Sequence, residues 1–173
     1  NPYVAYNPNI PTEEIATSPY KYGTEGVVYA TRPLILGGKK IENFGFRFEN
    51  GKVVEVLADE GKEMLESLVA TDEGSAYLGE AALVQYDSPI SQSGLVYYVT
   101  LIDENASCHV ALGRGFCDTI DGFEDKSLEE CQALGVNDSM IHVDFMIGAP
   151  DLEITGYKDG VAYPIFKDGN WAF

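Results

Sequence analysis

The chain has 173 residues, 45% of them hydrophobic and 23% charged, which suffices for a single domain with a substantial core. Its formal net charge of -17 argues against nucleic acid and membranes as partners, because phosphate-rich surfaces are bound through lysine and arginine. A large acidic excess instead suits solubility, or a protein that gathers carboxylates around cations.

The three cysteines, Cys108, Cys117 and Cys131, form neither an even nor a regularly spaced set. This argues against a disulfide framework and fits a reducing compartment, so we expect a cytoplasmic location. The sequence contains no apolar run of membrane-spanning length and no visible signal peptide. It begins at Asn1 rather than methionine, as a piece of a longer protein would.

In chain order, residues 26–58 have the pattern of a β-meander. A first strand-like run, residues 27–36, is followed by a second in which Phe44, Phe46 and Phe48 share one face. Asn50-Gly51 then predicts a tight hairpin turn. Residues 59–71 change to a helical period, with the apolar positions Met64, Leu65, Leu68 and Val69.

We expect further strands at residues 79–86, 94–102, 107–113 and 142–148. Ser127 and Glu130 form a capping-box pattern that predicts a short helix, which ends at Gly135. Residues 152–173 contain two Asp-Gly turns and are typical of closing hairpins. The predicted fold class is α+β: one β-rich domain over residues 1–173, with a meander, hairpins and a few short helices.

The stretch "MIHVDFMIGAP" (140–150) places an imidazole and a carboxylate on one strand face. Side chains alternate along a strand, so His142 and Asp144 point one way while Val143 and Phe145 point the other. The second pair suits the core. A plain buried strand would avoid the first pair, because unpaired polar groups are costly to bury.

The second histidine has a similar setting. His109 lies between Ser107 and Ala111 on its strand face, and Glu104 precedes it by five residues. Further carboxylates stand at strand or turn ends: Glu80, Glu13 and Glu14.

Carboxylates that converge in one cleft repel one another and take up protons unless a cation is present. Two cations fit a site with four or more acidic ligands, and imidazole with carboxylate suits zinc, cobalt, manganese or iron(II). Taken singly, each motif has a simpler interpretation: a surface or hydrogen-bonded His-x-Asp pair, or a glutamate on the solvated side of a strand.

Six segments in order, "IPTEE", "LGEAALV", "DSPISQSGL", "LIDENASCHVALG", "HVDFMIG" and "DG..YPIFKDGNWA", resemble the C-terminal half of one family. It is the aminopeptidase T family of thermophilic-type metallo-aminopeptidases (AmpS- and PepS-like, peptidase family M29). The resemblance implies a catalytic C-terminal domain without the family's N-terminal α/β domain. It also implies release of N-terminal amino acids from peptides, two divalent metal ions and a homodimer.

Carried over by position, the resemblance implies six metal ligands: Glu14, Glu80, Glu104, His109, His142 and Asp144. Glu80 is expected to bridge the two ions, and Glu13 is the alternative to Glu14 in the ligand set. Metal-activated water would attack the scissile carbonyl, with Glu80 at the reacting centre and Glu13 moving the proton to the leaving amine.

One position departs from the family pattern. Where the family has a tyrosine seven residues after the first histidine, this chain has Phe116. Phenylalanine has no hydroxyl, so any role of that hydroxyl at the metal or the tetrahedral intermediate does not carry over.

Two other functions remain open from the sequence. An iron(II) oxygenase would use a triad of two histidines and one carboxylate, here His142, Asp144 and His109. In the common arrangement the second histidine follows the His-x-Asp pair, whereas His109 precedes it. Alternatively, the chain could be a metal-binding or assembly module without turnover. Cys108 and Cys131 are weaker candidates as nucleophiles, and we expect both to be packing residues.

Overall fold

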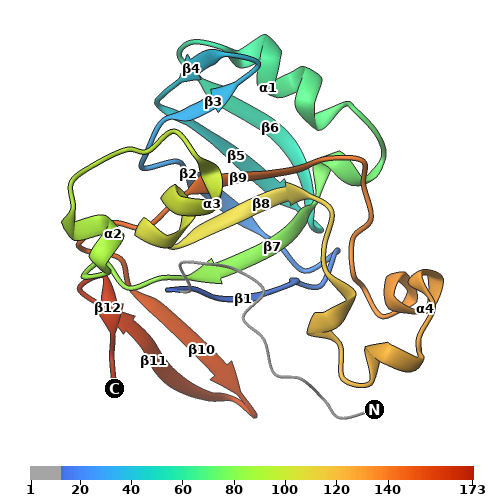
Figure 1. Ribbon diagram of the computed structural model, residues 1–173. Helices are drawn as coiled ribbons and strands as arrows, with labels where there is room; N and C mark the ends of the chain where they lie inside the picture. The colour runs from blue at the N-terminus through green and yellow to red at the C-terminus, as the bar shows by residue number, and fades with distance from the viewer. Residues whose placement is uncertain (1–12) are drawn as a thin grey trace.

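A computed structural model describes residues 13–173. Its centre is a four-stranded antiparallel sheet in the order β1-β7-β8-β9 (Figure 1). The strands are β1 (Ile15–Thr17), β7 (Leu78–Leu83), β8 (His109–Gly113) and β9 (His142–Met146). Segments far apart in the chain thus become neighbours in this sheet.

The meander forms a second antiparallel sheet, in the order β2-β5-β6, behind the central one (Figure 1). It contains β2 (Gly26–Tyr29), β5 (Phe44–Glu49) and β6 (Lys52–Ala58). Positive φ at Asn50 and Gly51 confirms the predicted hairpin turn. The run expected as one strand at 27–36 is divided, because Pro33 has no N–H for a ladder, and β3 (Leu34–Leu36) pairs instead with β4 (Lys39–Ile41).

The core lies between these two sheets. Phe44, Phe46 and Phe48 are buried as predicted, and the Phe46 ring centroid lies 5.2 Å from that of Phe145 on β9. Helix α1 (Lys62–Val69) closes one end through Leu65, which confirms the predicted helical stripe. The face of β9 that carries Phe145 is therefore fixed by the hydrophobic effect, which in turn directs His142 and Asp144 away from the core.

The C-terminal segment forms a third sheet, β10 (Ile154–Lys158), β11 (Val161–Lys167) and β12 (Asn170–Trp171), with positive φ in both predicted Asp-Gly turns. Helix α4 (Leu128–Ala133) starts at the predicted capping box of Ser127 and Glu130. The other short helices are α2 (Pro89–Gln92), α3 (Thr100–Asp103), η1 (Gly74–Ala76), η2 (Glu104–Ala106), η3 (Cys117–Thr119) and η4 (Phe123–Asp125). The predicted β-rich α+β class is confirmed.

The strand expected at 94–102 is wrong. Residues 94–99 are irregular and lead into α3, although their composition is typical of a strand. The carboxylate of Asp103 accepts the N–H groups of Tyr97 and Val99 at 2.8 and 3.1 Å. The backbone of this segment is therefore satisfied locally.

The three cysteines are free, as expected, and Cys108 and Cys131 are buried. Within residues 13–173, no helix has the length and apolar character needed to cross a membrane.

Candidate metal centre

Three adjacent strands bring polar side chains to one face of the central sheet. The register pairs Glu80 with Ala111 and Ala111 with Asp144, so both carboxylates lie at the same level on either side of a small side chain. His109 precedes Ala111 by two residues on β8 and His142 precedes Asp144 by two residues on β9, so both histidines lie on the same face as the carboxylates. The predicted sharing of a face by His142 and Asp144 follows from this alternation.

His109 is oriented by the main chain of its own strand. Its Nδ1 donates to the carbonyl oxygen of Ser107 at 2.9 Å, since a carbonyl can only accept. Its Nε2 then faces Glu14, whose Oε2 lies 3.2 Å away. The ring is 1% exposed, so this orientation is fixed within the protein.

His142 has the same arrangement on the neighbouring strand. Its Nδ1 donates to the carbonyl oxygen of Arg114 at 2.7 Å. Its Nε2 lies 3.1 Å from Oε2 of Glu80 and 3.4 Å from Oδ1 of Asp144. Both imidazoles thus use Nδ1 for the main chain and direct Nε2 at carboxylates, as metal-binding histidines usually do.

In the absence of a cation, protons neutralise these carboxylates. Burial lowers the pKa of His109, but its hydrogen bonds to Glu14 and Ser107 and the charge of Asp144 outweigh this and raise it to about 9. For His142 burial likewise lowers the pKa, and Asp144, Glu80 and the Arg114 carbonyl raise it to about 10. Each protonated imidazole places positive charge at Nε2, beside the carboxylates. A divalent cation would bind there in place of the Nε2 proton.

The donor set fits a divalent ion. Among the described residues, one donor atom each from Glu80, His109 and Asp144 lie within 4.8 Å of one another. Oδ1 of Asp144 is buried with no hydrogen bond of good geometry, and its contact with Nε2 of His142 is long, at 3.4 Å. A buried carboxylate oxygen left in this state is costly, and a cation would satisfy it.

A cleft of about 620 Å³ opens onto this group. Five of the six expected ligands line it: Glu14, Glu80, Glu104, His142 and Asp144. The sixth, His109, lies beneath it against Glu14. The structure therefore brings all six expected side chains to one place.

Two further expectations concern residues at the edge of the cleft. Glu14, rather than Glu13, is a lining residue, whereas the main-chain N–H of Glu13 donates to Oδ1 of Asn105 at 2.7 Å. Phe116 also lines the cleft, and its ring centroid is 5.0 Å from that of His142. The position that is tyrosine in the family pattern thus adjoins one of the two imidazoles.

Sequence reasoning missed the groups that orient the two histidines. The carbonyls of Ser107 and Arg114 act through the main chain and carry no side-chain signal. Gly79 allows the second contact: a Cβ there would lie 2.2 Å from the Arg114 carbonyl oxygen. A glycine directly before a strand glutamate was the available signal in the sequence, and in the structure it coincides with an irregular register between Leu78 and Glu80.

Paired carboxylates and main-chain-oriented imidazoles on one sheet face are typical of proteins that bind divalent cations. Comparison with known proteins gives the particular family. Residues 2–171 match the family of thermophilic metalloproteases (M29), and the chain belongs to it.

The relatives are aminopeptidases by name. The chain is 54% identical over 166 residues to aminopeptidase AmpS of Bacillus subtilis and 51% identical over 171 residues to aminopeptidase 2 of Geobacillus stearothermophilus. These alignments cover 95% and 98% of this chain, but only 40% and 41% of the two relatives. The chain thus spans about two fifths of the length of the relatives that it matches.

A solved structure has the same fold. Wild-type AmpT from Thermus thermophilus superposes with a TM-score of 0.86 at 45% sequence identity, over 96% of this chain and 41% of that one. The resemblance noted from the sequence motifs is therefore confirmed at the level of family and fold.

Proposed function

We propose that residues 1–173 form the catalytic C-terminal domain of a metal-dependent aminopeptidase, which hydrolyses N-terminal amino acids from peptides. Family membership and the names of the relatives support this reaction class. The observation that carries the proposal is the orientation of His109 and His142, each held through Nδ1 so that Nε2 faces the carboxylates of one cleft.

Two divalent ions, zinc, cobalt or manganese, would be held by the six side chains. Two imidazoles that face different carboxylates, Glu14 for His109 and Glu80 for His142, suit two ions better than one. Glu80 lies between the two histidine strands and β1, so it is the proposed bridge. Bound ions would supply Lewis acidity and lower the pKa of a coordinated water toward neutrality.

The protein itself would position the peptide. A bound ion would offer a site for the free amine of the peptide, which N-acetylation blocks, and the acidic excess of the chain would attract the cationic N-terminus. Glu13, adjacent to Glu14, is the proposed carrier of the proton to the leaving amine. Peptides with a free N-terminus are accordingly the proposed substrates.

The remaining expectations are also proposals. A homodimer and a cytoplasmic location follow from the family resemblance and from the free cysteines. Neither nucleic acid nor membrane is a proposed partner, because the net charge of -17 opposes binding to phosphate.

Hydrolysis is favoured over the two alternatives. Membership of a metalloprotease family argues against an iron(II) oxygenase built on His109, His142 and Asp144. A module that binds metal without turnover differs from an enzyme in one measurable property, which is turnover that disappears on chelation and returns with metal.

The test uses the longest natural form of the protein, freed of metal and then supplied with zinc, cobalt or manganese. We expect release of amino acids from unblocked peptides, loss of release with chelator, and at least about a hundredfold lower rate on N-acetylated peptides. Equal rates on both kinds of peptide would remove the amine-recognition part of the proposal.

A matched pair of variants ties the activity to the site. Glu80→Gln keeps the shape of the side chain but removes its charge, and we expect loss of metal binding and turnover. Glu60→Gln makes the same change at an exposed glutamate outside the cleft and should leave both unchanged. If Glu80→Gln retained full metal affinity and turnover, the proposed site would be wrong.

A further inference from the structure

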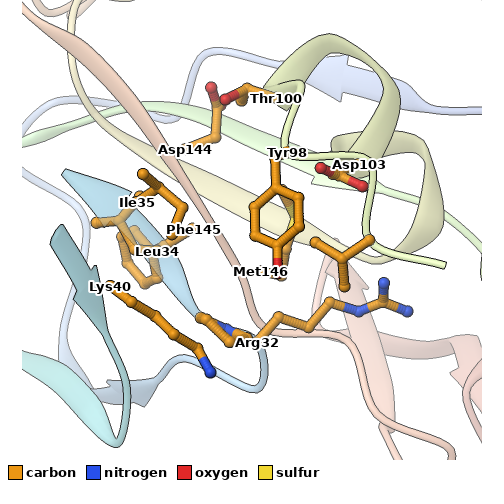
Figure 2. A pocket seen from close by; sticks show the side chains of 12 residues that line it. Arg32, Leu34, Ile35, Lys40, Tyr98, Thr100, Asp103, Asp144, Phe145 and Met146 are labelled. Carbon is orange, nitrogen blue, oxygen red and sulfur yellow. The ribbon is translucent and has the colours of Figure 1, made fainter. Parts of the chain in front are cut away.

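A second hollow adjoins the cleft on the other side of α3. Its apolar lining, here called the apolar pocket, is formed by Leu34, Ile35, Val96, Tyr98, Phe145 and Met146 (Figure 2). Figure 2 shows Tyr98 standing opposite Ile35 and Leu34, with Asp144 and Thr100 at one end. Polar groups of Asp144 and Thr100 therefore line one end of an otherwise apolar hollow.

Asp144 joins the two hollows, because it lines both the cleft and the apolar pocket. Helix α3 and the residue after it are divided between them: Thr100 and Asp103 line the pocket, whereas Leu101 and Glu104 line the cleft. A molecule held in the cleft beside Asp144 therefore has an adjoining space for one of its side groups.

The wall formed by Tyr98 is held in a strained conformation. Tyr98 has a φ of 58°, a left-handed value that costs a non-glycine residue about 1–3 kcal/mol. The carboxylate of Asp103 holds both sides of it by accepting the N–H groups of Tyr97 and Val99. The ring is nevertheless 74% exposed, so packing into the core does not explain the conformation.

The size and chemistry of the pocket suit an uncharged, apolar group. Its volume is about 180 Å³, and an apolar cavity of about 150 Å³ binds benzene. Two cations, Arg32 and Lys40, line it together with two carboxylates, Asp103 and Asp144, so the lining carries no net positive charge. The pocket is therefore not arranged to bind an anion.

We propose that the apolar pocket binds the side chain of the substrate's N-terminal residue, so that Ile35 and Tyr98 determine which residue is released. This rests on the proposed aminopeptidase function. It predicts a preference for leucine or phenylalanine over alanine at the N-terminus, by about 10- to 200-fold in kcat/KM, as hydrophobic pockets usually provide.

The test narrows the pocket and compares substrates. Ile35→Trp, at a side chain 45% exposed, should reduce the leucine-to-alanine ratio of kcat/KM by at least about tenfold on Xaa-Ala-Ala peptides. Val27→Trp adds the same ring at a 50% exposed strand position outside the pocket and should leave the ratio unchanged. A ratio that is equal in the wild type and Ile35→Trp would overturn the proposal.

A second pair of variants does not depend on tolerance of a larger side chain. Tyr98→Gly removes the ring, and glycine adopts the left-handed conformation without strain, so folding is retained. The leucine-to-alanine ratio should fall by at least about fivefold, whereas Tyr98→Phe, which keeps the ring, should retain it. If Tyr98→Gly changed the preference for the second residue, measured on Ala-Xaa-Ala peptides, and not the preference for the first, the pocket would bind the second residue. That result would contradict the proposal.

Measuring the binding of free amino acids tests the pocket independently of the aminopeptidase function. If no peptide were hydrolysed, the aminopeptidase function would fail, and the pocket would be tested by calorimetry with free L-leucine and L-alanine. We expect leucine to bind at least about tenfold more tightly, and Ile35→Trp to abolish the difference. Equal affinities in the wild type would overturn the pocket itself.

Discussion

Each histidine of the site is fixed at the scale of a single ring. A main-chain carbonyl holds Nδ1, of Ser107 for His109 and of Arg114 for His142, so the rings cannot turn away when a proton leaves Nε2. Their raised pKa values, about 9 and 10, mean that a metal ion must displace protons to bind. Metal affinity should therefore increase with pH across the neutral range.

Phe116 is the residue at which this chain departs from the family pattern. Its ring lies beside His142 and lines the cleft that the expected ligands share. We expect Phe116→Tyr to raise kcat by about tenfold or more, because a hydrogen-bond donor at a developing oxyanion is worth at least that much. Phe173→Tyr, at a 91% exposed ring, is the control and should have no effect. Unchanged steady-state kinetics for Phe116→Tyr would show that no oxyanion develops within reach of this position.

At the scale of elements, the irregular register between β7 and β8 sets the position of Glu80 and His142 together. Gly79 lies at the irregularity and touches the Arg114 carbonyl, which in turn holds His142. We expect Gly79→Ala to displace that carbonyl and lower metal affinity by about 10- to 100-fold, as loss of a supporting contact usually does. Metal titration by calorimetry is the measurement. Gly23→Ala, where a Cβ would meet only ordinary contacts at 3.4 Å, should bind metal like the wild type.

A carboxylate outside the cleft holds the segment that leads into β9. Asp72 accepts the N–H of Met140 at 2.6 Å and the hydroxyl of Ser139 at 2.8 Å. The hydrogen bond from Met140 is the largest influence on the pKa of Asp72 and lowers it. Burial raises this pKa, but the hydrogen bonds from Ser139 and Ser75 lower it further, to about 2. The network thus connects the start of η1 to the strand of His142 and Asp144.

This shift predicts a pH-dependent contribution to stability. Because the pKa of Asp72 is lower in the folded state, its stabilisation is present above the unfolded value of about 3.9 and lost as pH falls toward 2. Asp72→Asn should cost about 1–2 kcal/mol in the free energy of unfolding at pH 6, after allowance for solvent screening. Denaturant titrations at several pH values measure this. A difference between wild type and variant that persisted undiminished at pH 2 would contradict the assignment.

Sequence patterns predicted much of the fold, whereas the full set of candidate ligands came from the resemblance to the family. The turn at Asn50-Gly51 and the phenylalanine face of β5 are local signals, and strand alternation alone places His142 with Asp144. Which strands become neighbours is not local: nothing near Glu80 indicates that Ala111 and then Asp144 lie beside it. The failed strand at 94–102 has a different, local cause: its strand propensity is overridden by the carboxylate of Asp103, which accepts the N–H groups of Tyr97 and Val99.

At the scale of the whole molecule, the proposed metal centre joins distant parts of the chain. Its side chains come from the segment before β1, from β7, β8 and β9, and from η2. Binding of one cation at this centre should stabilise the native state by about 2.7 kcal/mol at a hundred times its Kd. For a domain of this size that corresponds to a rise of about 5–10 °C in Tm. Calorimetric scans with and without cobalt measure the rise. Glu80→Gln should lack it, whereas Glu60→Gln should keep it; an equal rise in both would mean that cobalt binds elsewhere.

The most direct test is anomalous diffraction at the cobalt edge from crystals of the protein saturated with cobalt. The account predicts two peaks in the cleft, with ligand atoms of the six side chains at about 2.0–2.2 Å and Glu80 in contact with both ions. Cobalt bound only at other carboxylates, with Glu80, His109 and Asp144 holding no ion between them, would contradict it.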